Sequence, residues 1–121
     1  MNRRHRSLKA WQDAVVLVEE VYAATSSFPR EETFGLTAQM RRAAVSVPAN
    51  LAEGAARTGT KELLRFVSIA VASLSELDTH VEIARRLGFL NDQRLDARLD
   101  AVAGLLMALE SSLKKKLRST N

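Results

Sequence analysis

The stretch QMRRAAVSVPANLAEGAAR, residues 39–57, decides how the chain folds. Four apolar side chains recur in it at spacings of 4, 3 and 4 residues: Met40, Ala44, Val47 and Leu51. This spacing is typical of a helix, although Pro48 lies near the centre and Gly54 follows. Because the pattern crosses the proline without changing phase, we predict one helix that is kinked at Pro48 and ends near Gly54.

The same stretch carries a polar seam. On a helical wheel six side chains lie within about 80° of one another: Gln39, Arg42, Ser46, Asn50, Glu53 and Arg57. We interpret the seam first as structural, because Pro48 frees the carbonyl of Ala44 and Asn50 lies near enough to supply a donor. A solvent-facing stripe of ordinary surface charges and a contact with a ligand or RNA are the alternatives.

Outward from this stretch, apolar spacing predicts three more helices and no strand. The expected bounds of the four helices are about 8–26, 33–55, 60–87 and 92–118. Short loops between amphipathic helices indicate an all-α fold, an antiparallel up-down-up-down four-helix bundle in a single domain over residues 1–121. The predicted N-caps are Thr33, Thr60 and either Asn91 or Asp92, and the predicted stop signals are Gly54, Gly59 and Gly88.

Each of the other helices has a predicted core stripe. In the first helix the stripe is Leu8, Trp11, Val15, Val18 and Tyr22, flanked by a row of Ala14, Leu17 and Val21. In the third helix it is Leu63, Phe66, Val67, Ala70, Leu74, Leu77, Val81 and Ala84. In the fourth helix it is Leu95, Leu99, Val102, Leu106, Leu109, Leu113 and Leu117.

Charge is distributed unevenly over the predicted bundle. The 18 Lys and Arg and 14 Asp and Glu residues leave a net charge of +4. The topology brings eleven basic residues to one end, the basic end: Arg3, Arg4, Arg6, Lys9, Arg57, Lys61, Arg65, Lys114, Lys115, Lys116 and Arg118. Only Glu53, Glu62 and Glu110 oppose them nearby, so this end is a candidate nucleic-acid-binding surface. No aromatic residue is expected among these cations, so base stacking is not predicted.

Several kinds of chemistry are not expected. The chain has no cysteine, which excludes disulfides and thiolate metal sites and suits a cytoplasmic location. No apolar run reaches the ~20 residues needed to span a bilayer, so no membrane partner is predicted. The di-iron motif has a Glu three residues before a His. The residue three before His80 is Leu77, so this motif is excluded. Ser73, Asp78 and His80 share one helix and are interpreted as solvated or lightly packed. We expect no catalytic residue, metal or cofactor.

The third helix carries a second apolar row opposite its core stripe. This row, the outer row of the third helix, consists of Ile69, Ala72, Glu76, Ile83 and Leu87. Exposing it, together with the flank of the first helix, would leave a large apolar patch on a monomer, so self-association is predicted. Scattered surface Ile and Leu residues on a monomer are the alternative.

Two stretches resemble a known family over about residues 8–110. FGLTAQMRRAAVSVPANLAEGAAR, residues 34–57, and KELLRFVSIAVASLSELDTHVEIARRLGFL, residues 61–90, are similar to the four-helix-bundle family of 23S-rRNA intervening-sequence proteins. The positions that match the family pattern are Glu32, Gly35, Leu36, Gln39, Arg41, Arg42, Ser46, Pro48, Asn50, Ala52, Glu53, Gly54, Ser73, Leu74, Glu76 and Leu77. Ala72 replaces the usual glycine, which is expected to alter how closely its helix approaches a neighbour.

The resemblance implies a bacterial four-helix bundle that assembles into a ring, a homopentamer, without catalytic activity or cofactor. It also implies similarity to the accessory protein of diversity-generating retroelements, which is pentameric and basic and binds nucleic acid and a reverse transcriptase. Together with the basic end, this favours a non-catalytic oligomer that binds structured RNA or other nucleic acid, including DNA. An oligomeric scaffold or adaptor with a protein partner is the alternative.

Overall fold

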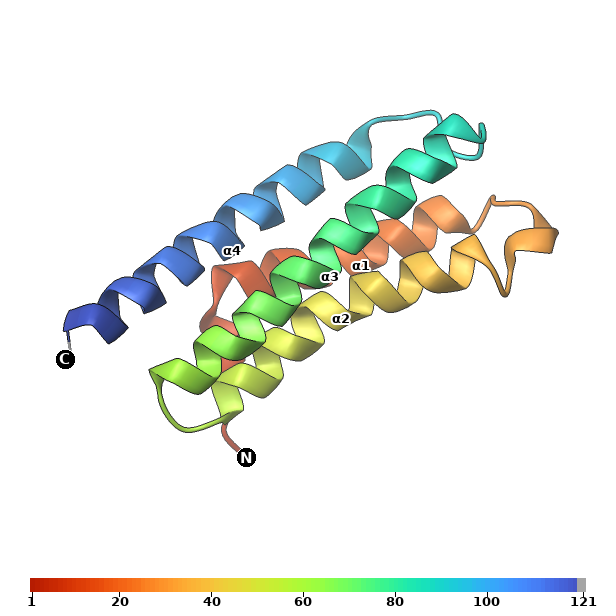
Figure 1. Ribbon diagram of the computed structural model, residues 1–121. Coiled ribbons are helices and arrows are strands. Elements are labelled where there is room, and N and C mark those ends of the chain that lie inside the picture. The colour runs from red at the N-terminus through yellow and green to blue at the C-terminus, as the bar shows by residue number, and fades with distance from the viewer. Residues whose placement is uncertain (120–121) are drawn as a thin grey trace.

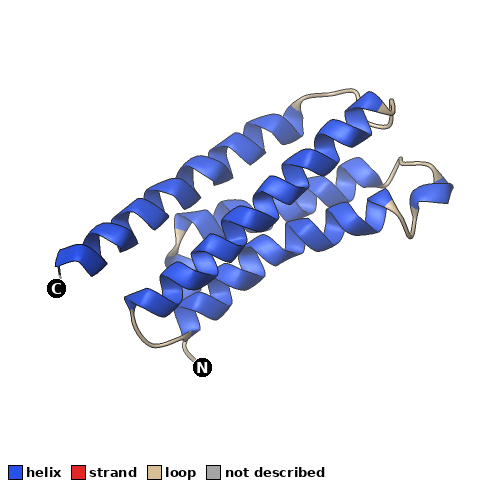
Figure 2. Cartoon of the chain, viewed as in Figure 1, coloured by secondary structure: helices blue, strands red, loops and turns tan. Residues whose placement is uncertain are grey.

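Four long α-helices form an up-down-up-down bundle, and the computed structural model describes residues 1–119 of the chain (Figures 1 and 2). The helices are α1 (Lys9–Thr25), α2 (Leu36–Ala56), α3 (Thr60–Arg86) and α4 (Arg94–Ser119), with short 3₁₀ helices η1 (Arg4–Ser7) and η2 (Arg30–Glu32). Figure 1 shows neighbouring helices running in alternate directions, with the N-terminus, the α2–α3 loop and the end of α4 at the same end. The predicted all-α four-helix bundle is confirmed, with no strand among residues 1–119.

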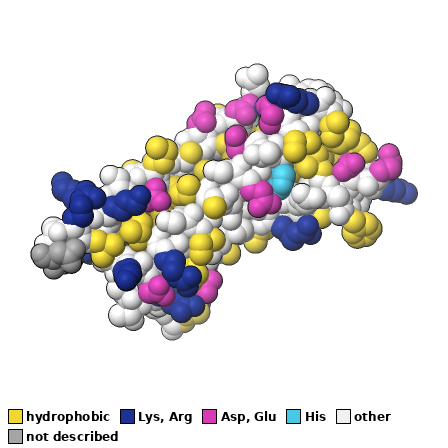
Figure 3. Space-filling model, viewed as in Figure 1, with side chains coloured by type: hydrophobic (Ala, Val, Ile, Leu, Met, Phe, Trp, Pro, Cys, Tyr) yellow, Lys and Arg dark blue, Asp and Glu magenta, His cyan; other side chains and the backbone are white. Residues whose placement is uncertain are grey.

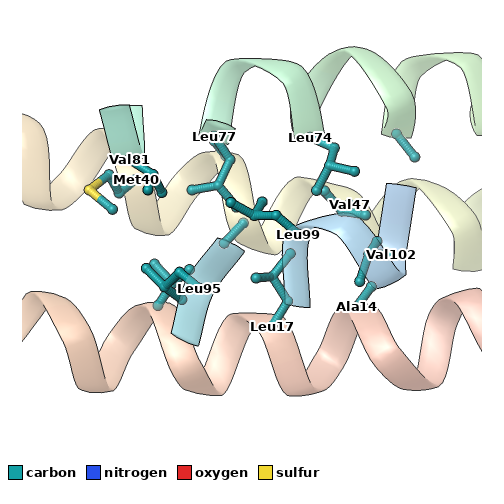
Figure 4. Close-up of a cluster of buried hydrophobic side chains, with 14 of the residues drawn as sticks. Ala14, Leu17, Met40, Val47, Leu74, Leu77, Val81, Leu95, Leu99 and Val102 are labelled. Carbon is teal, nitrogen blue, oxygen red and sulfur yellow. The ribbon is translucent and has the colours of Figure 1, made fainter. Parts of the chain in front are cut away.

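The core stripes of α2, α3 and α4 lie where the sequence predicts them. Met40, Ala44, Val47 and Leu51 of α2 are all completely buried. Of the predicted α3 and α4 stripes, only Leu63, Leu109 and Leu117 are merely half-buried, and the others are buried. α2 packs most extensively against α3, and the aliphatic side chains of all four helices meet along the bundle axis (Figure 4).

α1 turns a different face to the core from the predicted one. Ala14, Leu17 and Val21, expected as a flank, are completely buried, and Figure 4 shows Ala14 and Leu17 pointing into the core cluster. The residues of the predicted stripe are half-buried or exposed instead: Leu8, Trp11, Val15, Val18 and Tyr22. The small side chain of Ala14 allows the close packing that protein interiors require, while the amphipathic ring of Trp11 is better placed at a rim.

The start of α2 is capped by Glu32 rather than by Thr33. Leu36 N, the first N–H of the helix, donates to Glu32 Oε1 at 3.1 Å. The prediction for Thr33 is wrong, because its hydroxyl donates to Arg30 O at 2.7 Å within the turn of η2. Gly35 makes room for this cap, since a Cβ there would lie 3.0 Å from Glu32 Oε1. The Glu-x-x-Gly-Leu part of the family motif is therefore a helix start.

The predicted cap at Thr60 is also wrong. Thr60 is the first residue of α3, and the N-cap is Gly59 with φ of 95° and no side-chain cap. In contrast, Asp92 rather than Asn91 caps α4, because its Oδ1 accepts a hydrogen bond from Arg94 N at 3.1 Å.

Gly88 ends α3 as predicted. It has φ of 80°, and its N–H donates to Arg85 O at 3.1 Å. Phe89 N donates to Ala84 O at 2.9 Å, which completes a Schellman motif.

α2 continues through Pro48 and past Gly54 to Ala56. The kink expected at the proline stays a prediction. Gly54 is a buried packing residue within the helix rather than a stop signal, because a Cβ there would lie 2.7 Å from Phe66 Cβ of α3. The glycine therefore sets how closely α2 and α3 approach each other next to their loop.

Candidate functional site

The basic end lies on the surface of the protein. All eleven predicted residues are solvent-exposed, and Figure 3 shows Lys and Arg gathered at the end of α4 and beside the α2–α3 loop. Three of the eleven form ion pairs, each with a carboxylate three or four residues away: Lys9 with Asp13, Arg57 with Glu53, and Arg65 with Glu62. Eight form no ion pair within residues 1–119: Arg3, Arg4, Arg6, Lys61, Lys114, Lys115, Lys116 and Arg118.

Arg4 has a structural role that sequence reasoning missed. Its Nη2 donates to Ala55 O at 2.8 Å, across 51 residues of chain. Ala55 lies in the last turn of α2, where carbonyl groups lack partners within the helix. Arg4 therefore ties η1 to the end of α2 and fixes the N-terminal segment on the basic end.

Aromatic rings do lie among these cations, so the expectation that they would be absent is wrong. Phe66 is buried, and the guanidinium carbons of Arg57 and Arg65 lie 5.3 and 4.6 Å from its ring centroid. The guanidinium of Arg6 lies 5.6 Å from the ring centroid of Trp11, which is half-buried. Because Phe66 is covered, it acts as a support that positions two arginines rather than as a surface on which a base can stack.

The central part of the polar seam of α2 is in contact with α3. Asn50 Nδ2 donates to the backbone oxygen of Ser46 at 2.8 Å and to its hydroxyl at 2.9 Å. Ser46 Oγ lies 2.8 Å from Ser73 Oγ of α3, so two motif residues distant in sequence share one hydrogen bond. Asn50 thus supplies the predicted donor, but to the carbonyl of Ser46 rather than to that of Ala44.

The outer part of the seam is a surface. Gln39 and Arg42 are exposed, and Glu53 accepts a hydrogen bond from the exposed Arg57 at 3.1 Å. The neighbouring Arg41 was not predicted as a site residue, yet its Nε donates to Thr25 Oγ1 at 2.9 Å.

Arg41 also lies over the ring of Tyr22, with its guanidinium carbon 4.4 Å from the centroid. The first arginine of the motif therefore joins α2 to the end of α1, while the second faces solvent. Arg41 precedes the seam residue Arg42 by one position, and its place on the helical wheel gave no indication of these contacts.

His80 is buried, so of the two predicted alternatives, solvated or lightly packed, the first is excluded for this residue. It is 6 % exposed, its Nε2 lies 3.5 Å from Glu76 Oε2, and its Nδ1 has no hydrogen-bond partner in the described part of the chain. Asp78 is exposed, and Ser73 bonds to Ser46. No hydrogen bond joins Ser73, Asp78 and His80 to one another within residues 1–119, so they form no relay in this structure.

The outer row of the third helix, or α3 outer row, lies on the surface of the single chain. All of its five members are exposed, and the apolar side chains of Ile69, Ile83 and Leu87 are 38 %, 42 % and 57 % exposed. Ala72, where the family pattern has glycine, is exposed, so no other helix in the described part of the chain covers it.

The end of the bundle opposite the basic end, the far end, holds charges that are paired. Arg85 Nη2 of α3 lies 2.8 Å from Asp96 Oδ2 of α4, and Arg98 Nη2 of α4 lies 3.1 Å from Glu20 Oε1 of α1. The hydrogen bonds that Asp92 Oδ1 and Oδ2 accept from Arg94 lower the pKa of that carboxyl.

The carboxyl of Glu82 also has a lowered pKa, because it accepts a hydrogen bond from Arg86 Nε at 2.7 Å. Both shifts therefore arise from arginines that are paired with a neighbouring carboxylate.

Residues 1–119 contain neither a membrane-spanning helix nor a cluster of metal-ligating side chains. No helix is both long enough and apolar enough to cross a membrane. No group of three or more His, Asp or Glu side chains is placed to hold a metal ion.

The fold and the exposed cations define a small all-α protein, a four-helix bundle with one positively charged end. The model of the 23S rRNA-intervening sequence protein family matches residues 6–111 of the chain. The chain belongs to this family, as its two motifs predict. Among curated proteins, the comparison found no match.

Proposed function

We propose that the protein is a non-catalytic oligomer whose basic end binds structured RNA or other nucleic acid in the cytoplasm. The observation that carries the proposal is the group of eight exposed cations at one end that form no ion pair among residues 1–119. Such a cluster gains free energy from nucleic acid through the release of condensed counterions. The name of the family, which refers to an intervening sequence of 23S rRNA, points in the same direction.

The expected mode of binding is contact with the phosphate backbone. The ring of Phe66 is covered by two arginines, so base stacking on it is not available. Arg57 and Arg65 are held against that ring, so fewer rotamers are lost when their guanidinium groups meet phosphate. We therefore expect weak dependence on sequence and strong dependence on salt.

A salt titration tests this function directly. Fluorescence anisotropy is measured with 23S rRNA fragments and with random RNA of equal length, at about 50 and about 200 mM salt. The proposal predicts similar affinities for both RNAs and a steep loss of affinity with salt. No detectable binding at the lower salt, or an affinity that salt leaves unchanged, would overturn it.

Self-association is part of the proposal, and the α3 outer row supports it. Ile69, Ile83 and Leu87 are exposed on one helix face, with Glu76 between them in the row. Burying such a face against another copy removes apolar area from water. A ring of copies would also bring several basic ends together and strengthen the field that attracts a polyanion.

Charge reversal within the row tests the interface. Glu76→Lys is expected to lower the particle mass in light scattering, because it places a different charge in the proposed contact. Asp78→Lys is the matched control, since Asp78 is exposed on the same helix but outside the row. An unchanged mass for Glu76→Lys refutes this placement of the interface.

A protein-binding scaffold is the second candidate. Phe34, in the turn before α2, is 95 % exposed, which is unusual for a large apolar side chain and suits a protein contact. If this is the main function, a single protein is recovered with the chain in stoichiometric amount after nuclease treatment, and Phe34→Ser abolishes its recovery. Loss of all partners on nuclease treatment contradicts the scaffold and favours nucleic acid.

A further inference from the structure

A pocket of about 430 Å³ lies within the basic end, where η1 meets the end of α2, the start of α3 and the end of α4. Three cationic side chains line it: Arg4 of η1, Arg57 of the α2–α3 loop and Lys116 of α4. No Asp or Glu is among its lining residues within the described ranges. The wall therefore carries three positive charges from three separate segments, and one of them, Arg57, is paired with Glu53 at 3.1 Å.

The cations of this pocket keep free donors. Arg4 uses Nη2 on the carbonyl of Ala55, and Arg57 uses Nη2 on Glu53, which leaves the other N–H groups of each guanidinium. Lys116 forms no ion pair with the residues that the structure describes. Arg4 and Arg57 are held in place by these hydrogen bonds, and Lys116 lines the same pocket from α4.

The remaining wall combines hydroxyl groups with apolar side chains. Ser7 and Thr60 contribute hydroxyls, and Thr60 starts a helix whose N-cap, Gly59, has no side chain to satisfy the first N–H groups. Leu63 and Leu113 line the same pocket, and Leu113 is buried. Apolar walls reduce screening by water, which strengthens the attraction between the cations and a bound anion.

We propose that this pocket binds a terminal phosphate monoester of a nucleic acid strand, so that the basic end recognises strand ends. The inference rests on the proposed nucleic-acid binding and adds to it. A phosphate monoester carries about −1.5 to −2 charge at pH 7, whereas a backbone diester carries about −1. The pocket is lined by three cations and by no carboxylate, and of these cations only Arg57 has an ion pair, with Glu53. This lining favours the group of higher charge. Segments on several sides of the pocket suit a group that ends a strand better than one from which the strand continues in two directions.

The experiment compares one RNA sequence in three forms: with a 5′-phosphate, with a 3′-phosphate and with hydroxyls at both ends. Affinity is measured by anisotropy at pH 7.5 in constant salt. We expect one phosphorylated form to bind about tenfold more tightly than the hydroxyl form, and inorganic phosphate in excess to remove that preference. Equal affinities for the three forms overturn the inference and leave the proposed function intact. No binding of any form overturns both.

Two adjacent lysines of α4 provide a matched pair of variants. Lys116 lines the pocket and Lys115 does not, although both are exposed and carry the same charge. Lys116→Gln is expected to reduce the preference for the phosphorylated strand from about tenfold to about twofold. Lys115→Gln should weaken the binding of all three forms equally and keep the preference. Equal loss of preference in both variants contradicts a site in this pocket.

The pH dependence gives an independent arm. The second pKa of a phosphate monoester is about 6, so at pH 5 the group carries close to one negative charge, as a diester does. The ratio of affinities for phosphorylated and hydroxyl strands should therefore fall between pH 7.5 and pH 5. A ratio that stays constant over this range indicates that the charge of the terminal group is not recognised.

Discussion

The two ends of the bundle use the same types of charged residue in different ways. At the far end, Arg85 and Arg98 form ion pairs that join α3 to α4 and α4 to α1. At the basic end, each of the three ion pairs joins residues only three or four positions apart, and eight of the eleven cations form no ion pair among residues 1–119. In Figure 3, blue and magenta are interspersed away from the basic end, whereas blue dominates at the end of α4.

This difference shows how each end is held together. The far end combines apolar packing with cross-links between helices, including Arg85 with Asp96. The basic end relies on close packing at Gly54 against Phe66 and on the hydrogen bond from Arg4 to Ala55. Its exposed lysines at the end of α4, Lys114 to Lys116, form no ion pair among residues 1–119.

The largest expected effect comes from disturbing the packing at the basic end. Gly54→Ala places a Cβ 2.7 Å from Phe66 Cβ, so the backbones of α2 and α3 must separate. We expect a loss of about 2 kcal/mol in the free energy of unfolding, as for other overpacked cores. Chemical denaturation measures it.

Gly104→Ala is the control for that change. Gly104 lies in α4, and a Cβ added there would meet no neighbouring atom within 4 Å. The same substitution should therefore stabilise the protein by about 1 kcal/mol, because alanine has the higher helix propensity. If both variants are stabilised, the close contact of α2 and α3 does not hold the basic end together.

The next effect separates binding from folding. Replacing Lys114, Lys115 and Lys116 together by Gln should lower nucleic-acid affinity about tenfold or more at moderate salt and reduce the salt slope by up to about 3. The melting temperature should stay nearly unchanged, because these side chains form no ion pair within the described chain. Loss of stability without loss of affinity would contradict this prediction, because the lysines would then hold the fold together instead of binding nucleic acid.

A smaller effect is expected from the far end. Arg98 lies 3.1 Å from Glu20 and 3.7 Å from Asp13, so Arg98→Gln should lower the free energy of unfolding by about 1 kcal/mol. Affinity for nucleic acid should change little. Arg42→Gln is the matched control, because Arg42 is exposed and forms no ion pair among residues 1–119. Equal destabilisation by the two variants would show that the ion pairs of Arg98 do not contribute.

The smallest effect is the dependence of the far end on pH. The pKa of Asp92 is lowered in the folded protein, so its charge contributes stability above its ordinary pKa of 3.8, and this stability is lost as pH falls through the lowered value. Asp92→Asn keeps a helix-capping side chain but removes the charge. The melting temperature of the variant should lie below that of the wild type at pH 7, and the gap should close as the pH falls below the ordinary pKa of 3.8 and through the lowered pKa. A gap that widens on acidification contradicts the sign.

Sequence reasoning succeeded where one helix offered a single apolar stripe. The stripe of α2 from Met40 to Leu51 is wholly buried, and Gly88 ends α3 with the predicted geometry. It failed for α1, because two apolar rows of similar character lie on that helix. Only the fit against the other helices selects the row with Ala14 over the row with Trp11.

The candidate site, like the core, could be predicted from the sequence only in part. The sequence and the predicted topology were enough to bring the eleven cations to one end, because short loops between helices determine which termini are neighbours. They were not enough to find the hydrogen bond from Arg4 to Ala55, the contact of Ser46 with Ser73 or the burial of His80. Each of these depends on atoms from segments that are far apart in the chain.

The sequence by itself therefore determined the four helices, most of the core and the uneven charge, since periodicity and composition are local properties of the chain. The tertiary structure decided which face of α1 is buried, why Gly54 is a glycine and where a pocket opens among Arg4, Arg57 and Lys116. The physical reason is that close packing and convergence of charge are set by distances across the bundle, which no single helix specifies.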